Sequence, residues 1–173
     1  MRSIRMVVAA VLLTGCASQH ITQPAPSPTR TETCHPVTEP EIAALFDRWN
    51  NSLQSGDPRK VAANYAGHSI LLPTLSNEPR LTPEKREDYF HHFLADQPSG
   101  KIDFRHIDLS CNVATDSGLY TFSFAKTGAV ASGRYSFTYE WDGSDWLITS
   151  HHSSLMPEQA SKAKAVKAAA RKH

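Results

Sequence analysis

Residues 134–154 read RYSFTYEWDGSDWLITSHHSS, and this stretch decides the fold. In its first eight positions aromatic side chains alternate with polar ones, a period of two that predicts a strand with one aromatic face. The Asp-Gly pair at 142–143 predicts a hairpin turn, because glycine tolerates the positive φ that such a turn needs. Strict alternation along the return strand then places Trp146 and His152 on one face and His151 on the other.

Length and charge bound the possible functions. The chain has 173 residues, which suits one ordinary domain with tails, and a formal net charge of +1. Nucleic acid is not an expected partner, because binding phosphates requires a concentrated basic face. The aromatic residues gather between Phe46 and Trp146, so we expect the core within that span.

The N-terminal segment has the form of a bacterial targeting sequence. Arg2 and Arg5 precede a short apolar run at residues 6–13, which is too short to span a bilayer as a mature helix. The run ends in Leu-Thr-Gly-Cys at 13–16, which resembles a bacterial lipobox. We expect a lipoprotein signal peptide over residues 1–15 and lipidation of Cys16 by acyl chains such as palmitate, which would anchor the chain to a lipid bilayer. An ordinary signal peptide or an anchor helix is the alternative. Ala17, in place of aspartate, implies the outer membrane, on the periplasmic face of the bacterial cell envelope.

The segment after Cys16 and the end of the chain are expected to lie outside the core. Residues 16–37 predict a lipidated, proline-rich and disordered tether. Cys34 and Cys111 then remain, and two cysteines in an oxidising compartment are expected to form a disulfide. Two separate thiols are the alternative, and neither cysteine lies in a nucleophile motif that would favour a catalytic Cys–His pair. Residues 158–173 form a basic tail rich in alanine and lysine, without an apolar packing face.

Capping signals predict where the helices begin. Thr38 followed by Glu41 forms a capping box for a first helix, which ends at the Ser-Gly-Asp turn of 55–57. Asp57-Pro58 opens a short second helix, and Thr-Pro-Glu at 82–84 opens a third. The remaining apolar runs predict an α+β domain in which a curved antiparallel sheet wraps around the three N-terminal helices. The strands are expected at 69–73, at 101–111, at 119–126 and in the hairpin.

This order of elements, together with particular residues, resembles the NTF2-like superfamily. Within it, the sequence is most similar to the association domain of calcium/calmodulin-dependent protein kinase II and to its bacterial, SnoaL-like relatives. The resemblance covers residues 38–157, which we take as the domain. The segments that carry it are 46–57, the Leu-Pro pair at 72–73, Tyr89-Phe90 with Phe93, and 141–154.

The resemblance implies a cone-shaped fold and self-association as a homo-oligomer, a dimer or larger. Kinase activity and calmodulin binding are not expected, because the chain has no glycine-rich phosphate loop, His-Arg-Asp or Asp-Phe-Gly motif. The family's pocket is lined by arginines that hold small carboxylates, at positions that correspond here to Phe122, Ser136 and Ser153. Arg134 lies two residues before Ser136, hence on the same strand face, and is the expected substitute.

Several residues are candidates for binding such a ligand. A guanidinium suits a carboxylate geometrically, with a surface salt bridge as the alternative role. Aromatic residues suit the mouth of a cavity, although aromatics at helical spacing also form cores. Adjacent histidines on a strand point to opposite faces, so we expect no metal site, and no cofactor motif is present. The candidates are Arg134, His152, Tyr65, Tyr89 and Trp49, with Arg80 as a further one.

Three classes of function remain open at this point, and one of them is an accessory module that binds another envelope protein through the outer face of the sheet. The first is a non-catalytic envelope lipoprotein that self-associates and offers a pocket for a small carboxylate. The alternative is an enzyme of the polyketide cyclase or isomerase type, with Asp103 or Asp108 as general base beside His152 or Tyr120. A carboxylate that points into an enclosed cavity beside a hydrogen-bond donor would favour the enzyme.

Overall fold

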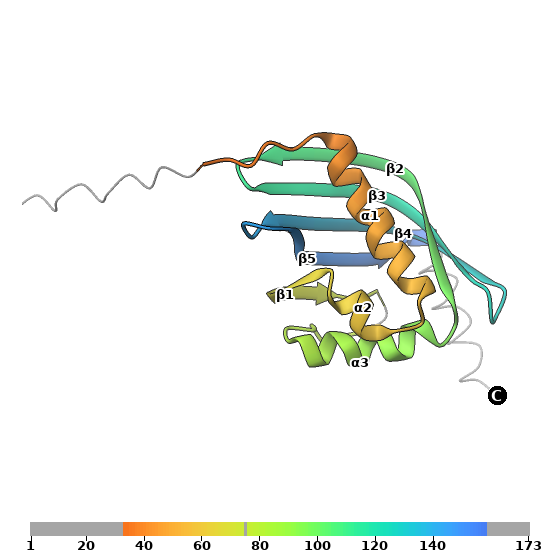
Figure 1. The fold of residues 1–173 in the computed structure, drawn as a ribbon. Helices are drawn as coiled ribbons and strands as arrows, with labels where there is room; N and C mark the ends of the chain where they lie inside the picture. The colour runs from red at the N-terminus through yellow and green to blue at the C-terminus, as the bar shows by residue number, and fades with distance from the viewer. Residues whose placement is uncertain (1–32, 75, 159–173) are drawn as a thin grey trace, which may run out of the picture. The chain divides into compact units, whose positions relative to one another are not determined.

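The computed structural model describes residues 33–74 and 76–158. The predictions for the signal peptide, for Cys16, for the tether up to residue 32 and for the tail from residue 159 fall outside this part. No helix among the residues described is long and apolar enough to cross a membrane. The elements, in chain order, are α1 (Glu39–Gln54), α2 (Pro58–Ala62), β1 (Tyr65–Leu72), α3 (Pro83–Leu94), β2 (Pro98–Ser110), β3 (Val113–Phe124), β4 (Ala129–Trp141) and β5 (Trp146–Leu155) (Figure 1).

The three helices begin where their capping residues predict. The carboxylate of Glu41 accepts hydrogen bonds from the backbone N–H of Thr38 at 2.8 Å and from its hydroxyl at 2.7 Å, which closes the first turn of α1. The side chain of Asp57 accepts from the backbone N–H of Arg59 at the start of α2. The hydroxyl of Thr82 accepts from the backbone N–H of Lys85 at the start of α3. Local chemistry therefore accounts for each helix start.

The sheet is mixed, which corrects the expectation of an antiparallel sheet. Its strand order is β1-β5-β4-β3-β2, and the pairs from β5 to β2 are antiparallel. The edge strand β1 pairs with β5 in parallel (Figure 1). The chain enters β1 from α2 and not through a hairpin from β5, so no tight turn imposes an antiparallel pairing.

A bulge in β5 changes which histidine faces the core. Thr138 pairs with Ser150, whereas its neighbour Tyr139 pairs with Ile148, so β5 contains one residue more than β4 at this point. Each extra residue exchanges the two faces for the rest of the strand. Before the bulge the buried residue is Ile148, and after it the buried residue is His151.

A second bulge changes the phase of β2. Ile102 pairs with Tyr120 and Phe104 with Leu119, so Asp103 is the extra residue. Opposite the bulge, a Cβ added at Gly118 would lie 1.9 Å from the carbonyl oxygen of Phe104, so only glycine permits this approach. Strict alternation from Ile102 would place Phe104 on the inner face. Beyond the bulge the two faces are exchanged, and Phe104 is 59% exposed.

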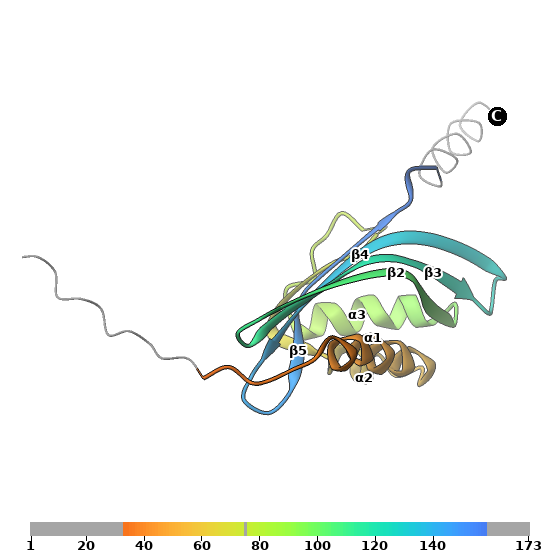
Figure 2. The ribbon, with the colours of Figure 1, turned by 90° about the horizontal axis from the view of Figure 1, so that it is seen from above.

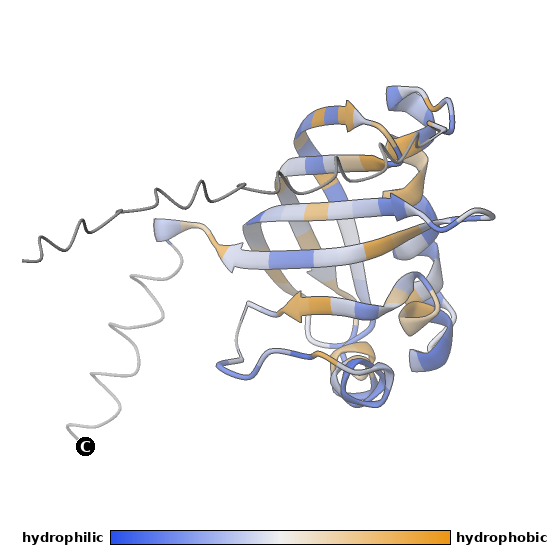
Figure 3. Cartoon of the chain, turned by 90° about the vertical axis from the view of Figure 1, so that its left-hand side faces the viewer, coloured by the Kyte–Doolittle hydropathy of each residue, from blue (hydrophilic) through white to orange (hydrophobic). Residues whose placement is uncertain are grey.

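The core lies between the concave face of the sheet and the helices. Figure 2 shows α1 and α3 beneath the curved strands β2 to β4. Trp49 of α1, 2% exposed, is at its centre, with edge-on ring contacts to Phe90, Phe122, Phe137 and His151. In Figure 3 hydrophilic and hydrophobic residues recur along the strands of the sheet. The inner face of the sheet packs on the helices, as the ring contacts of Trp49 with β3, β4 and β5 show.

A disulfide joins the segment before α1 to the turn between β2 and β3. Cys34 and Cys111, 77 residues apart, are bonded, as the sequence predicts. Beside the bond, the side chain of Asn112 accepts from the backbone N–H of His35 at 2.8 Å and donates to the carbonyl of Thr33 at 3.1 Å. The ring of His35 stacks on Trp141 with centroids 3.7 Å apart. The chain before α1 is thereby held against the end of the sheet.

Candidate functional site

A pocket of about 610 Å³ lies between the sheet, α3 and the loop that joins β1 to α3. That size suits a small organic ligand. Its polar side chains come from the loop, from α3 and from the strands β3 to β5, so residues far apart in the sequence meet there. Most of its wall is aromatic, formed by Trp49, Tyr89, Phe90, Phe93, Tyr120, Phe122 and Phe124.

His151 presents a neutral imidazole to this pocket. The indole of Trp49, which can only donate, gives a hydrogen bond of 3.1 Å to the hydroxyl of Tyr65. That hydroxyl, 2.8 Å from Nδ1 of His151, is then free to donate to it. Burial lowers the pKa of His151 to about 3, so the ring stays neutral and carries its proton on Nε2. Nε2 is buried and has no hydrogen-bond partner among the residues described, so its N–H is left unpaired.

Three hydroxyl groups meet next to His151. The hydroxyl of Ser153 forms short hydrogen bonds with those of Tyr120 and Thr74. Burial raises the pKa of Tyr120 to about 12, so its hydroxyl keeps its proton. The cluster joins the β1–α3 loop to β3 and β5, and all three residues line the pocket. Their protons can reorient toward an acceptor atom.

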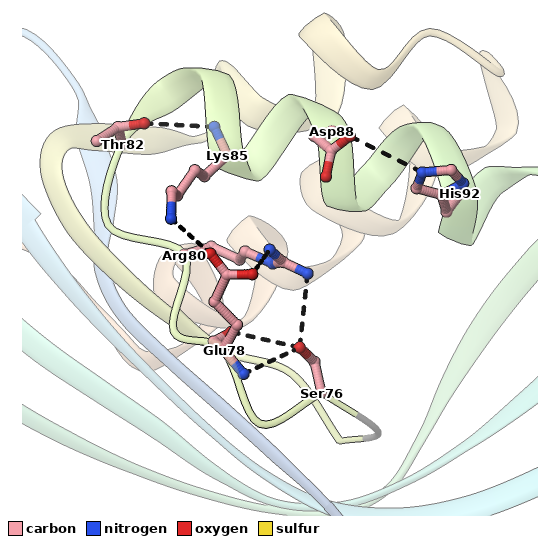
Figure 4. Close-up of polar contacts among 7 residues, drawn as sticks. All are labelled: Ser76, Glu78, Arg80, Thr82, Lys85, Asp88 and His92. Atoms are coloured by element: carbon pink, nitrogen blue, oxygen red, sulfur yellow. Dashed lines mark hydrogen bonds and ion pairs between the residues drawn. The ribbon is translucent and has the colours of Figure 1, made fainter.

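Arg80 brings a positive charge to the pocket. Its backbone forms two hydrogen bonds with that of Leu71, which fixes the loop to β1. Its guanidinium donates from Nη1 to Glu78 at 2.9 Å and from Nη2 to Ser76 at 3.5 Å (Figure 4). Nε is buried without a partner, and the guanidinium lies 6.0 Å from the centroid of the Tyr89 ring. The side chain is 15% exposed.

The free hydrogen-bonding capacity of the pocket is on the donor side. Among the buried polar atoms without a partner in the part of the chain described, two belong to pocket residues, Nε of Arg80 and Nε2 of His151. Both are N–H donors. The lining includes one carboxylate, Asp96, which is exposed. The arrangement therefore suits a ligand with acceptor oxygens, a negative charge and an apolar surface.

The predicted ligand-binding residues are placed as follows. Trp49 and Tyr89 line the pocket, and Tyr65 lies behind His151. The prediction that His152 faces the pocket is wrong, because the bulge in β5 turns it outward and turns His151 inward. Arg134 is also misplaced, since it is exposed on the outer face of β4, and the guanidinium at the pocket is that of Arg80.

Neither predicted catalytic aspartate reaches the pocket. Asp103, at the bulge of β2, accepts a hydrogen bond from Thr121 on the surface. Asp108 is 75% exposed and pairs with His106. The enzyme hypothesis based on these residues therefore lacks its general base, because β2 runs with the opposite phase beyond its bulge.

A buried carboxylate that is not among the residues predicted from the sequence lies elsewhere in the core. Asp116 on β3 has no exposed surface and accepts hydrogen bonds from Tyr135 at 2.8 Å and from Nε of Arg105 at 3.2 Å. It does not line the pocket. Its place on the inner face can be predicted from spacing, because Asp116 lies four residues before Tyr120 and six before Phe122 on the same face of the strand.

No group of three His, Cys, Asp or Glu side chains in residues 33–74 and 76–158 is arranged to hold a metal ion.

The sequence matches, over residues 38–157, the family described as the calcium/calmodulin dependent protein kinase II association domain. The chain belongs to this family. A solved association-domain protein from Xanthomonas campestris, described as putative, is 43% identical, with a TM-score of 0.67 over 73% of this chain and 97% of that chain. No curated protein matches the sequence.

More distant solved structures share the fold of this association domain. An NTF2-like protein from Novosphingobium aromaticivorans is 13% identical, with a TM-score of 0.58 over 68% of this chain and 81% of that one. The iota-carbonic anhydrase of a cyanobacterium, solved with bicarbonate, is 20% identical, with a TM-score of 0.62 over 69% and 93% of the two chains. The association domain is thus an NTF2-like fold, as its sequence predicts.

Proposed function

We propose that this association domain self-associates and binds a small oxyanion, a carboxylate or bicarbonate, in its pocket. The observation that carries the proposal is the donor set: the N–H of a neutral His151, the N–H of Arg80 and the hydroxyl cluster of Thr74, Tyr120 and Ser153. A bound oxyanion would supply the acceptors that Nε2 of His151 and Nε of Arg80 lack. Burying them unpaired costs about 1–3 kcal/mol each, so a ligand that pairs them gains affinity.

Bicarbonate is a member of this ligand class that suits the inner part of the pocket. The donors there are N–H and O–H groups, which can hydrogen-bond the oxygens of a singly charged, planar oxyanion. The cyanobacterial carbonic anhydrase with the same fold was solved with bicarbonate, which supports bicarbonate as the first ligand to test.

A second candidate function is the reversible hydration of carbon dioxide. The oxygen of a water molecule would add to the carbon of CO₂, one C=O bond would become a C–O⁻ bond, and the proton released would pass to the buffer. Donors aimed at the oxygen on which charge develops lower such a barrier. The specific support is that the hydroxyl cluster and His151 offer such donors. Asp96, the one carboxylate among the lining residues, is exposed.

The Ser153→Ala variant tests the oxyanion site. Removing the hydroxyl that links Tyr120 and Thr74 is expected to lower bicarbonate affinity about tenfold, because it removes one hydrogen bond to a charged group and disorganises two others. Binding would be measured by titration calorimetry, and CO₂ hydration by stopped-flow with a pH indicator. Ser150→Ala, on the same strand but outside the pocket, is the matched control. If wild-type protein binds neither bicarbonate nor formate at millimolar concentrations, the proposal fails.

We propose that the outer face of the sheet is the surface for self-association. On β4 this face presents Arg134, Ser136, Thr138 and Glu140, all at least partly exposed. The wild type is expected to be a dimer or a larger homo-oligomer by light scattering at micromolar concentration. Ser136→Arg, which places a charge amid this face, is expected to shift the mass toward the monomer. A monomeric wild type would rule the proposal out.

We also propose that Cys16 is lipidated and that the protein lies on the periplasmic face of the outer membrane. The support is the Leu-Thr-Gly-Cys sequence after a short apolar run. Metabolic labelling with alkyne-tagged palmitate, followed by membrane fractionation, would test it. Failure of Cys16→Ser to abolish the label would contradict the assignment.

A further inference from the structure

Arg86 of α3 is 1% exposed and does not line the pocket, so it is a buried cation outside the donor set of the proposed function. We propose that Arg86 is a positioning residue, which holds the backbone of β1 and thereby fixes Tyr65 against the ring of His151. This role rests on the proposed function only in taking His151 as a donor of the pocket. Arg86 itself would contact no ligand.

The strand β1 contains a wide bulge where it pairs with β5. Between two of its pairs β1 advances by five residues, from Tyr65 to Ile70, while β5 advances by two, from position 148 to position 150. The partner of His151 is therefore Leu71, whereas an uninterrupted parallel ladder would place His68 there. The bulge thus decides which part of β1 lies beside His151.

The guanidinium of Arg86 binds both ends of this bulge. Nη1 donates to the carbonyl of Ser69 at 2.9 Å. Nη2 donates to the carbonyls of Ala66 at 3.0 Å and Gly67 at 3.3 Å. One planar fork therefore joins the point where the chain leaves the ladder to the point where it returns. A lysine ammonium, a compact charge on a flexible stem, does not reproduce a rigid fork of this kind.

Tyr65 connects Arg86 to the pocket. It begins β1 directly before the bulge, and the guanidinium of Arg86 lies over its ring, 5.7 Å from the centroid. The hydroxyl of Tyr65 accepts from the indole N–H of Trp49 and lies 2.8 Å from Nδ1 of His151. The ring is therefore held on its face and at its hydroxyl, with the hydroxyl proton directed at His151. Loss of the fork is expected to let the ring move and to weaken the bond to Nδ1.

NMR of ¹⁵N-labelled histidine tests this assignment. The wild type is expected to show a neutral His151 with its proton on Nε2 and with Nδ1 in a hydrogen bond. Tyr65→Phe removes that bond and defines how far the Nδ1 signal moves when the bond is lost. Arg86→Lys is expected to move the signal in the same direction and to weaken bicarbonate binding about threefold to tenfold. Added to Tyr65→Phe, it is expected to move the signal no further.

Arg105→Lys is the matched control, because it alters another largely buried arginine, one that pairs with Asp116 and does not line the pocket. The Nδ1 signal of His151 is expected to stay at its wild-type position in this control. Thermal unfolding curves would measure the stability that each variant loses. The proposal is wrong if folded Arg86→Lys loses stability but keeps the wild-type signal, or if the control moves the signal as far.

Two further measurements keep the outcome clear. If Arg86→Lys does not fold, Arg86→Gln gives the same comparison, because its amide still donates to carbonyl oxygens. The NMR signal requires no ligand. A shifted signal in a protein that binds no bicarbonate would therefore support the role of Arg86 and overturn the proposed function. Bicarbonate binding with an unshifted signal would do the reverse.

Discussion

Replacing both Cys34 and Cys111 by serine is expected to lower the free energy of unfolding by about 4 kcal/mol. The disulfide closes a loop with a sequence separation of 77 residues, so its loss frees a long segment of the unfolded chain. In the folded protein it also holds the segment that stacks His35 on Trp141. Urea unfolding followed by tryptophan fluorescence would measure the loss, and the midpoint of thermal unfolding should fall by about 10 °C or more.

Chemical reduction provides the control for this variant. Reductant is expected to bring the wild type down to the stability of the double serine variant and to leave that variant unchanged. A variant as stable as the oxidised wild type would contradict the account. The pocket residues lie away from the bond, so the variant should keep its affinity for bicarbonate under conditions in which it is folded.

The second large effect is expected from Asp116→Asn, with a loss of about 2–3 kcal/mol in the free energy of unfolding. Burial raises the pKa of Asp116, although Tyr135 and Arg105 act to lower it, so desolvation of the carboxylate outweighs their attraction. The cost of the variant comes from the partner. Arg105, 24% exposed, would be left as a half-buried cation without a counter-charge.

A second substitution distinguishes this explanation from simple loss of packing. Adding Arg105→Met to Asp116→Asn removes the stranded charge and is expected to recover most of the lost stability. Asp108→Asn, on β2 and 75% exposed, is the matched control and should change stability by less than about 0.5 kcal/mol. If Asp116→Asn is as mild as the control, or if Arg105→Met adds further loss, the pair does not act as described.

Much of the architecture follows from short-range patterns. Thr38 with Glu41, Asp57 and Thr82 each satisfy backbone groups within one helical turn, so the helix starts can be read without knowledge of the fold. The alternation of 134–141 and the Asp-Gly turn are equally local. For the helix starts and the hairpin, the energy that selects the structure comes from neighbours in the sequence. The disulfide joins residues 77 apart, and it was predicted from the number of cysteines and the expected compartment.

The two bulges had no comparable signal. The extra residues at Asp103 and in β5 follow from how a curved sheet closes over α1 and α3, which is a property of the whole sheet. Each one exchanges the faces of the strand beyond it. Strict alternation assumes an uninterrupted ladder, so it predicts His152, and not His151, at the pocket. For the same reason it predicts Asp108 on the inner face of the sheet, whereas the bulge in β2 turns Asp108 outward.

The family, the α+β class and the aromatic character of the pocket wall can therefore be predicted from the sequence, because they depend on periodicity and on residue type. The binding groups are not. Thr74, Arg80, Tyr120, His151 and Ser153 come from a loop and two strands, and they meet because the bulged sheet and the Leu71–Arg80 backbone pairing bring them to one cavity. Their usefulness depends on which donors remain unpaired after folding. That balance is set by burial and by every neighbour in space, and only the folded chain settles it.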